Sequence, residues 1–336
     1  PLGEEGWYLF GGVDRAGVFT AQALEPRRLF MLEADQRFRG IDAGLRHIET
    51  ENWRVTPTSR GGLQRVALTA GGPWSAGDRA LVLHNFGGIG GTRGERITAF
   101  TVTGHFAFGE ARVVQDPVTA EPRFSIRYHQ IYANNPHGII AGTQDWTAYS
   151  GNLQRGWMGT RPISDVLIRE DSELMPELAT QAQVIMARYR TGDGTGVSTV
   201  TPATSCVQDS AQALWIAIDQ LRFRLGRRLE HPDLLALVEK GDLPERLENL
   251  ASLAKQLEQL LTPFGIVRRD WQANSTFLRA ERSQPPLLEG EEKSVGSLGA
   301  SGGFHRGQSL PEVVLSWRSM MPRRAHDDLA ALFLRR

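Results

Sequence analysis

The chain has 336 residues, with 38 basic and 38 acidic side chains and a formal charge of zero at neutral pH. This length predicts about two domains, and the balanced charge argues against a protein that holds nucleic acid through a basic surface. The single cysteine, Cys206, excludes an internal disulfide and a CxxC metal site. No apolar run is as long as a membrane span, and no signal peptide is expected.

The first part of the chain is predicted to be rich in β-strands. Aromatic and β-branched residues punctuated by glycine indicate strands within 7–10 and 13–23, and the segments 30–33, 53–70 and 80–84 are also strand-like, whereas 42–50 fits a short helix or a loop. The glycine-rich stretch 87–94 has neither the lysine of a phosphate-binding loop nor a following helix, so a hairpin connection or flap is favoured over phosphate binding.

Two strongly β-like segments follow, and each carries a histidine. His105 lies in RITAFTVTGHFAF at 96–108, and His129 lies in FSIRYHQIY at 124–132. Two proline-containing pairs between them, at 116–117 and 121–122, mark a turn. We therefore expect an antiparallel hairpin with one histidine on each strand.

The segment 133–162 is polar and aromatic and has no clear periodicity. Long irregular segments of this kind are typical of binding loops or rims. It supplies the candidate substrate-binding residues, whose aromatic members would suit peptide, glycan or acyl chains: Asn135, Gln144, Asp145, Trp146, Tyr149 and Trp157. A helix is predicted next, over 175–189.

The stretch TPATSCVQDSAQALWIAIDQLRFRL at 201–225 places Cys206 at the mouth of an amphipathic helix. Ser205 and Gln208 fit a capping box, which makes Cys206 the first helical residue. Free amides and the positive end of the helix dipole stabilise a thiolate there. Cys206 is therefore a candidate nucleophile, and the alternative is a small buried residue near a helix end.

The C-terminal part is predicted to be helical. A leucine stripe within 232–261 favours core packing of a helix, the Gly-, Ser- and Pro-rich segment 283–309 is typical of a linker or loop, and 329–336 fits a short helix. These features predict three regions: a β-rich N-terminal region at 4–95, a catalytic domain with a helical extension at 96–282, and a flexible linker and tail at 283–336.

A thiol nucleophile needs a base, which is usually a histidine oriented by a third polar side chain. His105 and His129 are preferred because strands hold side chains rigidly, and His137 is an alternative in a loop. Each strand histidine taken alone is equally well explained as a half-buried residue with its hydrogen bonds satisfied.

The order of these parts resembles the circularly permuted branch of the NlpC-type papain-like cysteine hydrolases: a strand with GHFAF, a strand with YHQIY, then TSCVQDSAQAL at a helix start. The resemblance implies an α+β fold, in which an antiparallel sheet accompanies a papain-like central helix. It also implies a peptidase or amidase with Cys206 as nucleophile, His105 as base, and His129 or Gln130 orienting the imidazole. The Cys206 amide would hold the oxyanion, with Gln144 or Asn135 as a possible donor. No cofactor or metal is expected.

A second resemblance involves TPATSCVQDSAQALWIAI and SWRSMMPRRAHDDLAALFL. Together they are similar to soluble extensions of large cyanobacterial proteins of the CPBP (CAAX-protease-like) intramembrane type. This implies membrane association through regions outside the chain. The alternative function is thus a non-catalytic substrate-binding or regulatory module linked to a membrane domain. A fast reaction of the Cys206 thiol with iodoacetamide would favour the hydrolase, and a slow reaction would favour the binding or regulatory module.

Overall fold

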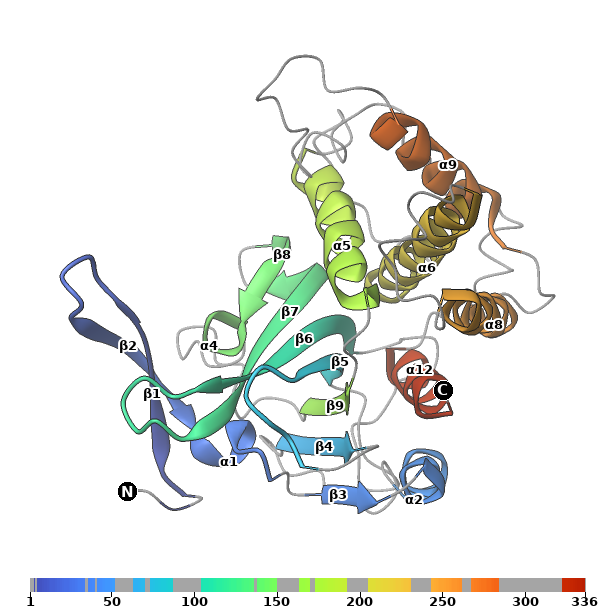
Figure 1. Cartoon of the computed structure of the whole chain (residues 1–336). Helices are drawn as coiled ribbons and strands as arrows, with labels where there is room; N and C mark the ends of the chain where they lie inside the picture. The colour runs from blue at the N-terminus through green and yellow to red at the C-terminus, as the bar shows by residue number, and fades with distance from the viewer. Residues whose placement is uncertain are drawn as a thin grey trace. The chain divides into compact units, whose positions relative to one another are not determined.

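In a computed structural model of the chain, the helices and strands fall into two units (Figure 1). The structure describes residues 3, 5–33, 36–39, 41–51, 63–69, 73–86, 104–135, 138–149, 163–169, 173–191, 205–230, 243–261, 267–283 and 322–335. The first unit comprises residues 1–129, 143–171 and 322–335, and the second comprises 130–142, 172–321 and 336. The chain passes between the units within the strands β7 and β8.

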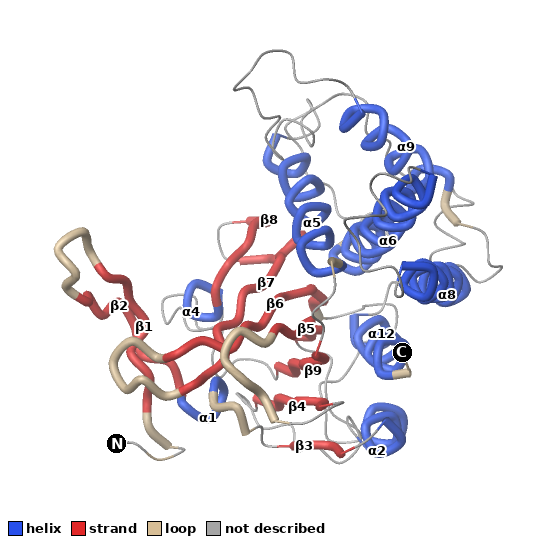
Figure 2. Tube along the Cα trace, viewed as in Figure 1, coloured by secondary structure: helices blue, strands red, loops and turns tan. Residues whose placement is uncertain are grey.

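The first unit is built on a seven-stranded sheet with the order β3-β4-β9-β5-β6-β7-β8. Figure 2 shows these strands in red. The strands are β3 (Gln36–Arg39), β4 (Leu63–Thr69), β5 (Arg79–Phe86), β6 (His105–Gln115), β7 (Pro122–Asn135), β8 (Gly138–Asp145) and β9 (Ile163–Arg169). A separate two-stranded sheet is formed by the hairpin of β1 (Trp7–Val13) and β2 (Phe19–Pro26).

The centre of the large sheet is antiparallel. β5 pairs antiparallel with β9 and β6, and β6 pairs antiparallel with β7, as the histidine-bearing hairpin predicted. The outer strands β3 and β4 pair in parallel, and β4 pairs in parallel with β9. The predicted α+β class is confirmed, and the antiparallel sheet is its central part.

β5 is the core strand of the first unit. Its residues from Ala80 to Phe86 are all buried, and a strand covered on both faces reads as a continuous apolar run such as ALVL. The predicted boundary at residue 95 falls between β5 and β6, which are neighbours in this one sheet.

The last helix, α12 (Pro322–Leu334), belongs to the first unit and contacts β5, β6 and β9. It begins earlier than the predicted helix at 329–336, and proline is well suited to the first helical position. Its apolar side, including Leu329, Ala330 and Phe333, is buried. Beside it lie α2 (Ile41–Arg46) and the π-helical turn His47–Glu51.

The second unit contains long helices: α5 (Leu174–Thr191), α6 (Cys206–Glu230), α8 (Leu243–Leu261) and α9 (Arg269–Ser283). α6 contacts the other three and is buried along most of its length, which confirms the predicted helix beginning at Cys206. The leucine stripe of α8 is core packing as predicted, because Leu250, Leu253 and Leu257 are buried. None of the described helices has the length and apolar character needed to cross a membrane.

Several local predictions differ from the structure. The segment predicted as a strand at 30–33 follows the short helix α1 (Arg27–Phe30), and only Met31 makes an isolated bridge, to Arg123. The supposed irregular segment 133–162 contains β8 and the helical turn α4 (Trp146–Tyr149). The glycine-rich stretch 87–94, His137 and most of the predicted linker at 283–309 lie outside the described residues.

Gly109 provides a stability test of the central sheet. A Cβ atom placed there would lie 2.5 Å from the Arg127 carbonyl oxygen and 3.4 Å from Tyr128 Cδ1. We expect Gly109→Ala to lower the free energy of unfolding by about 1–3 kcal/mol, because the neighbouring strand must shift. Urea unfolding monitored by tryptophan fluorescence measures the change.

The matched control is Gly226→Ala in α6, where nothing lies within 4 Å of the added methyl group. Alanine is the better helix former by about 1 kcal/mol, so this variant should be as stable as the wild type or more stable. Equal effects of the two substitutions would contradict the proposed role of Gly109.

Candidate functional site

Cys206 is the first residue of α6, forms no disulfide and is partly exposed. Ser205 caps the helix. Its hydroxyl accepts a hydrogen bond from the Gln208 amide at 3.3 Å, and its carbonyl accepts one from the Asp209 amide at 2.9 Å. The helix therefore begins where the capping box predicted. A thiol at this position lies at the positive dipole end of a 25-residue helix.

Buried polar residues contact the first turn of α6 in the second unit. Arg268 is almost fully buried and makes a two-pronged ion pair with Asp270, with distances of 3.0 and 2.7 Å. Its Nη1 also donates to Gln208 Oε1 at 3.2 Å. A guanidinium group thus fixes the Gln208 side chain in the helical turn that begins at Cys206. Sequence reasoning did not identify Arg268.

The same helix start carries further buried polar side chains. Ser210 and Gln212 are each at most 2% exposed, and Ser210 Oγ and Gln212 Nε2 have no hydrogen-bond partner among the described residues. Buried polar groups of this kind cost stability, so their concentration around a candidate nucleophile favours a functional role for this region.

His105 begins β6 in the first unit and is 7% exposed. Its ring packs edge-on against two other polar aromatic rings, with centroid distances of 6.5 Å to His84 and 6.4 Å to Tyr149. His84 and Tyr149 also pack against each other at 5.2 Å, so the two rings contact the imidazole from the same side. The structure brings together His105 and Tyr149, which sequence analysis proposed separately.

His84 is the centre of a buried polar cluster that sequence analysis missed. His84 Nδ1 lies 2.6 Å from Asp165 Oδ1, and His84 Nε2 lies 3.0 Å from the Tyr149 hydroxyl. Tyr128 donates its hydroxyl proton to Asp165 Oδ2 at 2.6 Å. A carboxylate, an imidazole and two phenols thus form one continuous network beside His105. The available sequence signals were a histidine ending the apolar run ALVLH and an aspartate within ISDVLIR.

His129 is buried in β7, and its Nδ1 lies 3.1 Å from Thr143 Oγ1. Burial lowers the pKa of His129 to about 4, and the positive charge of Arg127 contributes. The imidazole is therefore neutral at physiological pH. Its Nε2 has no hydrogen-bond partner among the described residues. The adjacent Gln130 is also fully buried.

The predicted aromatic rim is wrong for two of its members. Trp146 is 2% exposed and packs edge-on against Phe30 at 5.4 Å, and Tyr149 is 1% exposed. Both belong to the helical turn α4, which buries them in the core. Trp157 lies outside the described residues.

The remaining substrate-binding candidates are Asp145, Gln144 and Asn135. Asp145 Oδ1 accepts the Ala148 amide at 2.7 Å and so caps α4, and Gln144 is half-buried. Asn135 ends β7, but its side chain lies outside the described part of the structure.

The candidates are distributed over both units. The first unit contains His105, His129, Gln144, Asp145, Trp146 and Tyr149, and the second contains Cys206, Gln130 and Asn135. Within the described segments, no group of three or more His, Cys, Asp or Glu side chains is arranged to hold a metal ion.

Comparison with family models, curated proteins and solved structures gives no significant match to this chain.

The lowered pKa of His129 predicts an acid-sensitive fold. The folded-state pKa of about 4 lies below the ordinary value of about 6.5. The stabilisation is therefore complete above pH 6.5 and is lost as the pH falls toward 4, by up to about 3 kcal/mol. We expect His129→Gln to lose less stability than the wild type between pH 7 and pH 4.5 in urea unfolding experiments. Identical losses would contradict the prediction.

Proposed function

We propose that the protein is a cysteine hydrolase, a peptidase or amidase, in which Cys206 is the nucleophile and His105 the general base. The observation that carries the proposal is the position of Cys206: a partly exposed thiol at the first residue of a Ser205-capped helix. Cysteines at helix N-termini have lowered pKa values, because amides and the helix dipole favour the thiolate.

The surroundings of Cys206 support this role. The hydrogen bond from Arg268 holds the side chain of Gln208, which belongs to the helical turn that begins at Cys206. An oxyanion formed by attack on a carbonyl needs preorganised donors, and backbone amides at a helix start are suitable donors. A site that is fixed before substrate binds requires no reorganisation in the transition state.

The surroundings of His105 support its role as base. A general base must be held in one orientation and have a nitrogen available to the nucleophile. The rings of His84 and Tyr149 pack against His105 and restrict its rotation. The role of His129 or Gln130 in orienting the imidazole stays a prediction. The register pairs His129 with Phe108, which lies on the opposite face of β6 from His105.

The proposed reaction has two steps. In the first, His105 takes the thiol proton, Cys206 Sγ attacks the carbonyl carbon, the C–N bond breaks, and His105 gives the proton to the leaving amine. In the second, His105 takes a proton from water, the hydroxide attacks the thioester, and the released thiolate is protonated again. The acyl donor would be a peptide, a glycan-linked amide or an acyl amide.

Thiol alkylation tests the proposal. We expect Cys206 to react with iodoacetamide with an apparent pKa well below the value of about 8.5 for a free thiol. Cys206→Ser should abolish labelling. His105→Ala should raise the apparent pKa and slow the reaction at pH 7, because the imidazole no longer takes the thiol proton.

The matched control is His47→Gln, which removes another buried histidine of the first unit, in the turn beside α12. This variant should react as the wild type does. A slow reaction with an ordinary thiol pKa in the wild-type protein would overturn the proposal and favour the binding or regulatory module linked to a membrane domain.

A further inference from the structure

The hairpin of β1 and β2 has one face made only of apolar residues. Cross-strand partners lie on the same face of a hairpin, and Trp7 pairs with Pro26, Leu9 with Leu24, and Val13 with Phe19. Phe19 Cζ lies 2.9 Å from the place where a Gly11 side chain would begin, which puts its ring on the face that Gly11 leaves open. The face, which we call the outer face, consists of Trp7, Leu9, Val13, Phe19, Leu24 and Pro26.

Three residues of the outer face are exposed, and Leu9, Phe19 and Pro26 are half-buried. Trp7 is 48%, Val13 61% and Leu24 54% exposed. Contiguous exposed apolar residues mark association sites more often than isolated ones do. The hairpin projects from the large sheet in Figure 1, so both of its strands are presented along their length.

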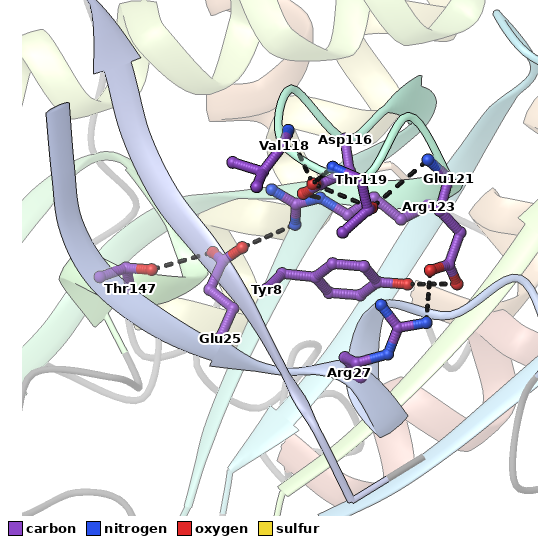
Figure 3. A network of polar contacts seen from close by, with 9 residues as sticks. All are labelled: Tyr8, Glu25, Arg27, Asp116, Val118, Thr119, Glu121, Arg123 and Thr147. Atoms are coloured by element: carbon purple, nitrogen blue, oxygen red, sulfur yellow. Dashed lines mark hydrogen bonds and ion pairs between the residues drawn. The ribbon is translucent and has the colours of Figure 1, made fainter. Parts of the chain in front are cut away.

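The opposite face of the hairpin is fixed to the first unit through Tyr8 (Figure 3). The Tyr8 hydroxyl donates to Glu121 Oε1 at 2.9 Å, and the guanidinium groups of Arg27 and Arg123 lie 4.5 and 4.8 Å from its ring centre. Arg27 also pairs with Glu121. Burial raises the pKa of Tyr8 above its ordinary value, so the phenol remains a donor.

Glu25 on β2 provides the second attachment. Its Oε2 accepts a hydrogen bond from Arg123 Nη1 at 2.6 Å, and its Oε1 accepts one from the Thr147 hydroxyl at 2.9 Å. The base of the hairpin is therefore attached to the β6–β7 turn and to α4. Because this face is held inward, the outer face points away from the unit and cannot turn to bury itself there.

The hairpin also lacks protection against pairing. Exposed strands usually carry charged residues that prevent association. β1 has none, and the one charged residue of β2 is Glu25, which is engaged with Arg123. A two-stranded sheet gains stability when a further apolar layer covers it.

We infer that the outer face binds the same face of a second copy of this chain, with the two hairpins antiparallel about a two-fold axis. An uncharged face opposes no like charges when it meets itself, and two-fold dimers are the commonest symmetric assemblies. In this arrangement the tip of one hairpin lies over the base of the other. The exposed Arg15 at the tip then meets the exposed Glu5 at the partner's base, which is a favourable pairing.

The charges around the face favour a protein over an anionic membrane. Membrane-binding surfaces carry clusters of basic residues. The described charges at the tip and base are Glu5, Asp14, Arg15 and Arg28, which balance. Asp14 is used by the turn, where its carboxylate accepts the amides of Ala16 and Val18.

Sedimentation equilibrium of the full chain tests the inference. We expect the wild type to form a reversible dimer of twice 37.2 kDa. Leu24→Glu should raise the dimer dissociation constant at least about tenfold, because the two-fold axis brings two unpaired charges into an apolar interface. Thr20→Glu is the matched control: it adds the same charge to an exposed position of β2 that pairs with Gly12, off the outer face, and should leave the dimer intact.

Charge reversal tests the antiparallel arrangement. Arg15→Glu and Glu5→Arg should each weaken the dimer, and the double variant should restore it. A wild type that stays monomeric throughout the micromolar range would overturn the inference, as would a dimer unaffected by Leu24→Glu. Co-sedimentation of a monomeric protein with anionic vesicles, lost in Leu24→Glu, would identify a lipid surface instead and would also overturn it.

Discussion

The hydrogen bond between His84 and Asp165 organises the interior of the first unit. The two residues are direct partners on the neighbouring strands β5 and β9, and the network extends from them to Tyr128 on β7 and Tyr149 on α4. A buried carboxylate costs stability unless its oxygens are hydrogen-bonded. Here one oxygen contacts the imidazole and the other accepts a phenol, so removing any member would leave a buried polar group unpaired.

The network gives each ring nitrogen of His84 a hydrogen-bond partner. Nδ1 faces Asp165 Oδ1 and Nε2 faces the Tyr149 hydroxyl. Tyr149 in turn packs against His105. Hydrogen bonds and ring contacts therefore connect the core of the sheet to the proposed base. His105 packs against His84 on β5 and Tyr149 on α4, and His84 is held by Asp165 on β9.

The sequence predicted the elements whose signals are local. The apolar run at β5, the β-like residue types of β6 and β7, and the proline-containing turn between them predicted the antiparallel centre. Ser205 and Gln208 predicted the start of α6, because capping depends on residues three positions apart. The Ser205 hydroxyl does bond the Gln208 amide, while the Gln208 side chain accepts a bond from Arg268.

The missed features depend on residues distant in the chain. His84 and Asp165 are 81 positions apart, and Arg268 lies 60 positions from Gln208. Neither pair has a recognisable spacing in the sequence. Trp146 and Tyr149 were expected in an exposed rim because the segment around them lacks periodicity. α4 is only one turn long, too short to show a helical repeat, and Phe30 and His84 bury the two rings through tertiary packing.

Buried polar groups gather at several places in the described part of the chain, including the base of the β1–β2 hairpin, and two of these places contain the proposed nucleophile and base. The start of α6 buries Gln208, Ser210, Gln212 and Arg268. The sheet near His105 buries a histidine and an aspartate. A scaffold selected for stability alone would favour apolar residues at such positions, because replacing a buried ion pair by well-packed apolar residues is often stabilising. Polar residues that cost stability are retained where a side chain must be oriented or a charge accommodated. At the start of α6 and around His84, buried polar groups thus accompany the thiol and the imidazole that the proposed chemistry uses.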